Sequence, residues 1–166
     1  MAMEKKWFAV YTKPRHEKKV AELFELQGIE YYLPLVKTLK QWSDRKKKVE
    51  ETLIKSYIFV KTNFSDFPQI VRTNGVINFV KFEKKEAAIP EAQIQALKIF
   101  VNNDVEYSVT NEHFKKGQKV KITQGVLKDI EGELVSFSGK TKLYIRIEHI
   151  GYGLLAEVNS AFVEVL

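Results

Sequence analysis

The sequence has no cysteine and only three histidines among its 166 residues. Disulfides and thiolate zinc sites are therefore excluded, and a reducing, cytoplasmic compartment fits this composition. No apolar run approaches the roughly 18 residues that a membrane span requires. The apolar stretch at residues 7–11 is also too short for the core of a secretory signal peptide. We expect a cytoplasmic, monomeric protein that contacts no membrane and needs no cofactor.

Glycine is scarce in the first 101 residues, where only Gly28 and Gly75 occur, whereas the other six glycines follow. Charge divides the chain at the same place. Residues 1–101 contain 19 Lys and Arg against 12 Asp and Glu, and residues 102–166 contain 8 against 9. The stretch 102–113 is polar, rich in Asn and without helical periodicity, which is typical of a linker. We therefore predict a basic domain at 1–101, a linker at 102–113 and a near-neutral domain at 114–166.

The first domain alternates strand and helix patterns. Apolar, β-branched and aromatic runs predict strands at 7–11, 30–36, 53–62 and 76–82, and a hairpin with arms 37–42 and 46–51. Helices are predicted after Pro14, with a stop at Gly28, after a capping Ser65, and from Pro90. This order of elements predicts an α+β domain with an antiparallel sheet flanked by helices.

The second domain consists of short strand patterns with glycine at the turns. The predicted strands are 118–124, 131–137, 142–149, 153–158 and 161–165. About five short strands bury a core by curling into a small barrel. We predict that Gly125 adopts a positive φ in a turn and that Gly132 permits close approach of a neighbouring strand.

Residues 117–135 follow the pattern G-x-x-V-x-I-x-x-G-V-L-x-D-x-x-G-x-L-V, which resembles the KOW motif. Residues 1–101 resemble the NGN domain of NusG-family transcription factors. This resemblance is carried by KWFAVYTKPRHEKKVAELFELQGIEYYLP, LIKSYIFVK, GVINFVKF and IPEAQIQAL. The chain is most similar to the specialised paralogues, RfaH and the UpxY-like antiterminators. It departs from many relatives at Ile54-Lys55-Ser56-Tyr57, where they have Phe-Pro-Gly/Asn-Tyr.

The resemblance implies that the NGN domain binds the clamp helices of the RNA polymerase largest subunit. It also implies suppression of pausing and termination, commonly at one operon such as a surface polysaccharide locus. Exposed aromatic anchors would carry the polymerase contact, although each candidate could instead be a core residue. The candidates at matching positions are Tyr11, Ile54, Tyr57, Phe79, Ile94 and Leu97.

A second implied contact is with the non-template DNA strand. Basic residues at the start of the first helix would bind phosphate, and the basic run near the hairpin tip would reach upstream DNA. Either group could also be only a solvated, charged surface. The candidates are Lys13, Arg15, His16, Lys18, Lys19, Arg45, Lys46, Lys47 and Lys48.

The resemblance further implies that the KOW domain recruits NusE or Rho. The candidate contacts are Val126, Leu127, Lys128, Ile130 and Phe137. In RfaH this domain can instead form a helical hairpin. Six glycines among many Val, Ile and Thr residues disfavour helix here, so we expect a permanent barrel.

Two other classes of function compete with this interpretation. A KOW-containing RNA-binding or ribosome-associated protein would require a basic barrel, which a balance of 8 basic against 9 acidic residues does not provide. An enzyme would require clustered carboxylates or a His–carboxylate pair. The only histidine beside an acid is His16, next to Glu17, and neighbours in a helix do not face one another. We therefore predict no catalytic residues and no metal site.

Overall fold

The computed structural model describes residues 4–41, 43–103 and 105–166. The chain divides into two compact units, Met1–Ala88 and Ile89–Leu166. Trp42, at the end of the first predicted hairpin arm, and Asp104, in the predicted linker, lie outside the described residues.

The first unit is built on an antiparallel sheet with the strand order β2-β5-β1-β6, and β9 also pairs with β1. The strands are β1 (Lys6–Thr12), β2 (Glu30–Tyr32), β5 (Tyr57–Thr62), β6 (Val76–Phe79) and β9 (Ala88–Ile89). The central pair β1 and β5 is rich in the aromatic and β-branched residues that suit buried strands. Its register places Phe8 opposite Val60 and Tyr11 opposite Tyr57.

Two helices, α1 (Glu17–Gln27) and α2 (Phe67–Val71), pack on one face of this sheet. They bury a core with side chains from the three strands β1, β5 and β6, which includes Phe8, Val10, Val20, Phe24, Ile58, Ile70 and Phe79. The helix α1 ends as predicted, because Gly28 adopts a φ of 71° and its amide reaches the carbonyls of Phe24 and Glu25.

Of the three predicted helix starts, the one at Pro90 agrees with α3, whose N-cap is Pro90, and the other two differ. The side chain that caps the segment before α2 belongs to Asn63, which accepts a hydrogen bond from the Ser65 amide at 3.1 Å. This cap begins the short 3-10 helix η1 (Phe64–Asp66), so the predicted cap at Ser65 is wrong. The helix α1 begins at Glu17, three residues beyond Pro14.

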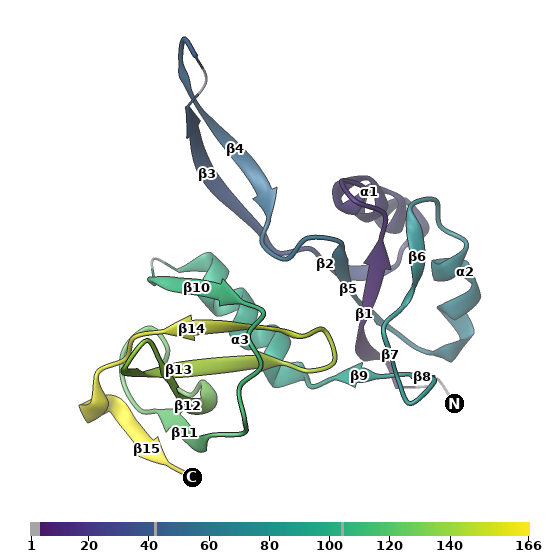
Figure 1. Ribbon diagram of the computed structural model, residues 1–166. Coiled ribbons are helices and arrows are strands. Elements are labelled where there is room, and N and C mark those ends of the chain that lie inside the picture. The colour runs from purple at the N-terminus through teal and green to yellow at the C-terminus, as the bar shows by residue number, and fades with distance from the viewer. Residues whose placement is uncertain (1–3, 42, 104) are drawn as a thin grey trace. The chain divides into compact units, whose positions relative to one another are not determined.

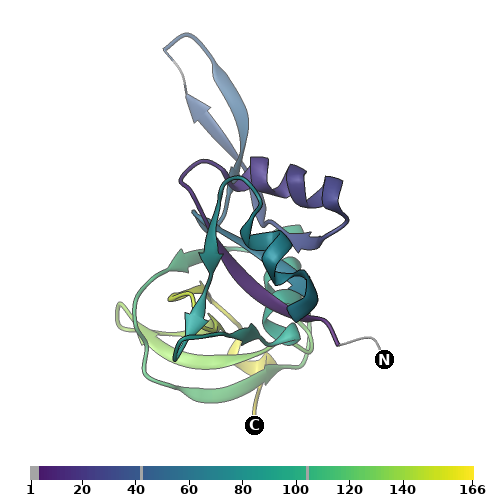
Figure 2. The same cartoon turned by 90° about the vertical axis from the view of Figure 1, so that its right-hand side faces the viewer.

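The predicted hairpin is present as β3 (Leu35–Gln41) and β4 (Lys46–Thr52). Leu35 lies opposite Thr52 at its base, and Gln41 lies opposite Lys46 near its tip. Pro34 separates β2 from β3, so the predicted strand 30–36 is interrupted. The hairpin forms its own two-stranded sheet and extends away from the rest of the first unit (Figures 1 and 2). A second small hairpin joins β7 (Lys81–Phe82) to β8 (Lys85–Glu86).

The second unit contains a six-stranded antiparallel sheet with the order β10-β14-β13-β12-β11-β15. The strands are β10 (Tyr107–Thr110), β11 (Gln118–Ile122), β12 (Glu131–Phe137), β13 (Lys140–Ile147), β14 (Tyr152–Ala156) and β15 (Val163–Val165). A short 3-10 helix, η2 (Ser160–Phe162), precedes β15. All five predicted strands occur with small shifts at their ends. Part of the predicted linker is regular, because β10 pairs with β14. Closure into a barrel stays a prediction.

Glycines allow close packing within this sheet. A Cβ at Gly132 would lie 2.8 Å from Leu143 Cδ1 and 2.9 Å from the Tyr144 carbonyl oxygen, and a Cβ at Gly117 would lie 2.1 Å from the Leu134 oxygen. The predicted close approach at Gly132 is therefore confirmed. Gly125 has a φ of 87°, as its predicted turn requires.

The last helix, α3 (Glu91–Asn102), groups with the second unit and packs on β13. Ile94, Leu97 and Phe100 have no exposed surface, and the Phe100 ring meets Tyr107 edge-on at 5.5 Å. The structure thus divides the chain at 88/89 rather than at residue 101. The physical reason is that the apolar face of α3 is buried in the second unit. Composition, from which the boundary was predicted, does not indicate which unit a helix packs against.

Candidate functional site

Tyr11 and Tyr57 form an aromatic pair on β1 and β5. They are cross-strand partners, and their ring centroids lie 4.9 Å apart with planes tilted by 42°. Because side chains alternate along a strand, Tyr11 points to the face opposite Val10 and the helix-covered core. Tyr11 is 37% exposed and Tyr57 is half-buried. The pair therefore presents aromatic surface on this part of the sheet.

The turn before Tyr57 places this pair. Ser56 has a φ of 66°, in the left-handed region that most residues avoid. Its carbonyl oxygen accepts a hydrogen bond from the Thr12 amide at 2.9 Å, which ties the turn to the end of β1. Ser56 stands at the position where the resembling sequences have Gly or Asn, the residues that adopt this conformation most readily.

The other four predicted polymerase contacts are buried. Phe79 packs edge-on against Phe8 at 5.9 Å, and its ring lies tilted against that of Phe67 at 4.4 Å, inside the core beneath α1 and α2. Ile54 and Phe79 are each 2% exposed, and Ile94 and Leu97 are fully buried. The predicted exposed patch therefore contains Tyr11 and Tyr57 but not these four side chains, because apolar spacing alone does not separate core from surface.

All five residues of the predicted α1 basic cluster, Lys13, Arg15, His16, Lys18 and Lys19, are exposed. Arg15 has a φ of 65°, a strained conformation of the kind that gathers at functional sites. The His16 ring is oriented by a 2.9 Å contact between its Nδ1 and the Pro14 carbonyl. Lys18 Nζ donates to the Glu50 carbonyl at 2.6 Å, so Lys18 also ties α1 to the hairpin.

A pocket of about 430 Å³ adjoins this cluster. Its lining includes Arg15 of the turn, Lys18 of α1, Lys40 of β3 and Lys55, which follows β4. Lys40 forms an ion pair with Glu51, and the hydrogen bond from Lys40 lowers the pKa of Glu51. Lys55 was not among the predicted DNA contacts. The feature of the sequence that could have drawn attention to Lys55 is its position next to Ser56 and Tyr57, in the stretch that differs from many relatives.

The predicted run at the hairpin tip is also exposed, from Arg45 to Lys48. The register places Lys47 directly opposite Lys40 and Lys46 opposite Gln41. Like charges opposite one another destabilise a strand pair. The positive charge of Lys40 and Lys47 therefore does not serve to stabilise the hairpin. The structure thus places two basic groups on different elements of the first unit.

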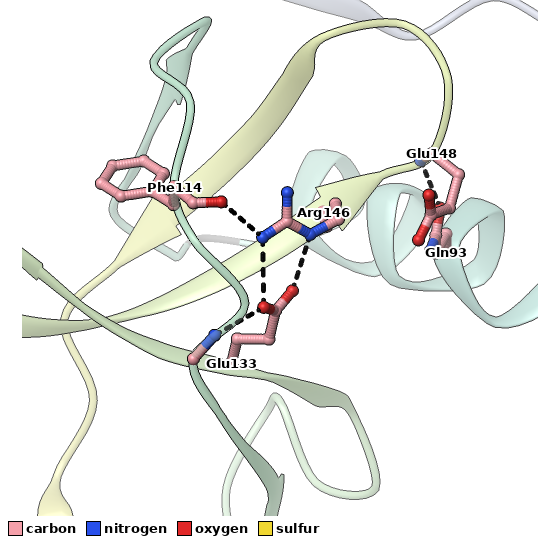
Figure 3. A network of polar contacts seen from close by, with 6 residues as sticks. Gln93, Phe114, Glu133, Arg146 and Glu148 are labelled. Carbon is pink, nitrogen blue, oxygen red and sulfur yellow. Dashed lines mark hydrogen bonds and ion pairs between the residues drawn. The ribbon is translucent and has the colours of Figure 1, made fainter.

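In the second unit the prominent charged feature is structural (Figure 3). Arg146 donates to both carboxylate oxygens of Glu133, at 2.9 and 3.1 Å, and to the Phe114 carbonyl at 3.0 Å. The Gly117 amide donates to Glu133 at 2.9 Å. Burial acts to raise the pKa of Glu133, but the bonds from Arg146 and Gly117 outweigh it and lower that pKa. In the same view, the Glu148 amide donates to Gln93 of α3 at 2.7 Å.

The predicted partner contacts of the second unit fall into two groups. Val126 is 59% exposed and Lys128 is exposed, whereas Leu127 and Ile130 are 8% and 5% exposed and belong to the core. Phe137 is half-buried and its ring lies 6.2 Å from that of Phe114. The loop therefore exposes Val126 and Lys128, while Leu127 and Ile130 anchor it in the core.

Within the described ranges, no three His, Asp or Glu side chains gather where a metal ion could be held. In the same part of the chain, none of the helices has the length and apolar character to cross a membrane.

The fold and these surfaces define an α+β protein in which a helix-flanked antiparallel sheet with exposed cations is followed by a glycine-rich β unit. The family model described as "Transcription termination factor nusG" matches residues 5–98. The chain belongs to the NusG family.

Curated and solved relatives span the whole chain. It is 22% identical to a protein of Borreliella burgdorferi named "Transcription termination/antitermination protein NusG", over 98% of this chain and 99% of that protein. A protein of the same name from Rickettsia conorii is 22% identical over 93% of this chain and 87% of its own length. The solved structure titled "Domain interaction in Thermotoga maritima NusG" has a TM-score of 0.53 and 21% identity, covering 99% of this chain and 98% of that one. This similarity supports a NusG-like fold.

Proposed function

We propose that this NusG-family protein is a transcription elongation and antitermination factor. In this proposal the first unit binds the clamp helices of the RNA polymerase largest subunit through Tyr11 and Tyr57. The same unit holds the non-template DNA strand with the α1 basic cluster and the hairpin tip. The observation that carries the proposal is the Tyr11–Tyr57 aromatic pair, with Tyr11 37% exposed, in the unit that bears most of the family match.

Tyrosine suits such an interface because it buries a large rigid ring and keeps a hydroxyl for hydrogen bonding. Interface energy concentrates in a few aromatic or arginine anchors. Tyr11 and Tyr57 support each other across the strands, so little side-chain entropy remains to be lost on binding. An α-helical partner would find two adjacent rings on a rigid sheet.

DNA binding would rest on the cations rather than on the end of α1 alone. A phosphate at a helix N-terminus is favoured by the free amides, but Glu17 places a buried carboxylate in the first turn, where its Oε2 accepts from Thr52 Oγ1 at 3.1 Å. That negative charge opposes a phosphate directly on the helix axis. Lys13, Arg15 and Lys19, which surround the turn, are better placed to neutralise the backbone of a strand.

The expected activity follows from differential binding. A protein that binds polymerase and the displaced strand together in the elongating state shifts the population towards that state. Pausing and termination then become less frequent without any chemistry by this protein. The second unit would recruit a further partner of the NusE or Rho type through Val126 and Lys128, since its near-neutral charge favours protein over RNA.

The test is binding of the full chain to a reconstituted RNA polymerase elongation complex. We expect Tyr11→Ala with Tyr57→Ala to weaken binding about 100-fold or more, because each anchor is worth about 2 kcal/mol at an interface. The matched control is Leu26→Ala with Phe64→Ala, which removes two apolar side chains that are 83% and 66% exposed on other elements. Equal binding by the tyrosine variant, with its thermal unfolding unchanged, would contradict the proposal.

A further inference from the structure

A groove of about 600 Å³ lies in the first unit between α1, β2 and the base of the hairpin, and it shares Lys18 with the α1 basic cluster. Its floor is apolar and buried, with Ala21, Ile29 and Leu33 each at most 9% exposed. Tyr31 of β2 forms its half-buried aromatic wall, whereas the ring of the neighbouring Tyr32 points to the opposite face of the strand and stacks on Phe59. The rim carries four exposed carboxylates, Glu22, Glu25, Glu30 and Glu50.

The two tyrosine rings are held firmly. The Tyr31 ring lies 6.4 Å from that of Phe24, and the Tyr32 ring stacks on Phe59 at 6.4 Å. The Tyr31 hydroxyl hydrogen-bonds Glu25; burial, and then this carboxylate, raise the pKa of Tyr31. The wall therefore needs no reorganisation before a ligand packs on it.

The charge of the groove is opposite to that of its surroundings. The first unit, residues 1–88, contains 18 Lys and Arg against 11 Asp and Glu, yet four of those acids border one groove. Lys18 is the only basic residue that lines it, and its ammonium donates to the Glu50 carbonyl. A ligand in the groove would thus meet carboxylates, the Tyr31 ring and an apolar floor.

We propose that this groove binds a Lys/Arg-rich segment of a partner protein. Guanidinium groups pair with carboxylates in a bidentate geometry and stack on aromatic rings, and their aliphatic stems cover apolar surface. An arginine packed on Tyr31 would reach Glu22 of α1, while an apolar neighbour would contact Ala21 and Ile29. The same carboxylates repel nucleic acid, which separates this surface from the α1 basic cluster.

This site is independent of the proposed polymerase contact, because it shares no residue with the aromatic pair. The probe is a short fluorescein-labelled peptide in which arginine alternates with leucine, titrated with the full chain and followed by fluorescence anisotropy. A chain of net charge +6 repels a cationic peptide in general, so binding would report a local acidic surface.

We expect Glu22→Gln with Glu30→Gln to raise the Kd for this peptide about three- to ten-fold, since exposed ion pairs contribute modestly. The matched control, Glu4→Gln with Glu83→Gln, removes the same charge from exposed positions outside the groove and should change the Kd less than about two-fold. In an amide NMR titration, the expected shifts centre on Ala21, Ile29 and Tyr31.

Three results would overturn the proposal. One is equal peptide affinity for the groove variant, the control variant and the unaltered chain. Another is amide shifts centred outside the groove. The third is either that a peptide with glutamate in place of arginine binds equally well or that single-stranded DNA displaces the arginine peptide from the groove. Either result would show that recognition of cations is not the basis of binding.

Discussion

The two units use charged residues in opposite ways. In the first unit the nine predicted DNA-binding residues are all exposed, whereas the Arg146–Glu133 pair of the second unit is largely buried, with side chains 23% and 13% exposed. Glycines with a positive φ and open space around them occur in both units, as at Gly28 and Gly125, and Gly117 and Gly132 of the second unit lie against neighbouring strands. The contrast in charge indicates that the first unit exposes its cations and the second uses a charged pair to hold its own strands.

The largest effect we expect comes from glycine packing. A Cβ at Gly117 would meet the Leu134 carbonyl oxygen at 2.1 Å, a backbone atom that cannot move aside cheaply. Gly117→Ala should therefore destabilise the second unit by about 3 kcal/mol. The comparison is Gly28→Ala, where only the left-handed backbone is at issue and about 1 kcal/mol is expected.

Amide NMR spectra during thermal unfolding would distinguish the two glycine variants. Gly117→Ala should lower the melting temperature of second-unit signals, and tryptophan fluorescence should change less, since both tryptophans, at positions 7 and 42, belong to the first unit. Equal destabilisation by the two substitutions would remove the distinction between close approach and backbone conformation.

The next effect concerns the buried ion pair. Glu133→Gln should cost about 2–3 kcal/mol, because it leaves the Arg146 guanidinium with a weaker partner in a largely buried site. The comparison in the first unit is Glu51→Gln, which removes the exposed partner of Lys40 and should leave chemical denaturation unchanged.

The ion pair also predicts a pH dependence. The pKa of Glu133 is lowered in the folded state from an ordinary value of 4.5. Its contribution to stability is therefore fully present above that ordinary pKa, and it is lost as pH falls through the lower folded value. The free energy of unfolding in urea, measured between neutral and acidic pH, should show this loss in the unaltered chain. In Glu133→Gln it should change less steeply with pH. Parallel curves would contradict the role assigned to the pair.

A smaller effect should appear in the salt dependence of DNA binding. Replacing Lys13, Arg15 and Lys19 together with Gln removes three cations beside α1, and the slope of log K against log salt for single-stranded DNA should fall by about 2. The matched change in the second unit replaces Lys115, Lys119 and Lys140, which are also exposed. If the two triple variants lose the same slope, net charge rather than a DNA-binding surface governs the affinity.

The smallest effect is expected at Ser56. Its φ of 66° is unfavourable for serine, so Ser56→Gly should relieve strain at the turn before Tyr57. Glycine also gains freedom in the unfolded chain, which leaves a net stabilisation of about 0.5 kcal/mol. Differential scanning calorimetry of the two proteins measures this shift, and Ser56→Ala, which keeps the Cβ, should not raise the melting temperature.

Local sequence patterns predicted most helices and strands, but they did not predict which apolar side chains lie at the surface. The stop at Gly28, the turn at Gly125 and the strands of the second unit follow from alternation and glycine position, which act over a few residues. The cap at Asn63 was missed because Ser65 is an equally good capping residue by type, and only the backbone path selects between them. The predicted exposure of Phe79 and Leu127 was wrong, because an apolar side chain at a strand end or in a loop can lie either in the core or at the surface.

The sequence by itself determined the class of each half, the charge contrast between them and the positions where glycine is required, because these depend on composition and short-range geometry. Tertiary structure alone decided that the rings of Tyr11 and Tyr57 meet across two strands and that four glutamates border one groove. It also decided that α3 packs with the second unit. Each of these depends on which distant segments share a surface, and that is settled only when strands pair and helices bury their apolar faces.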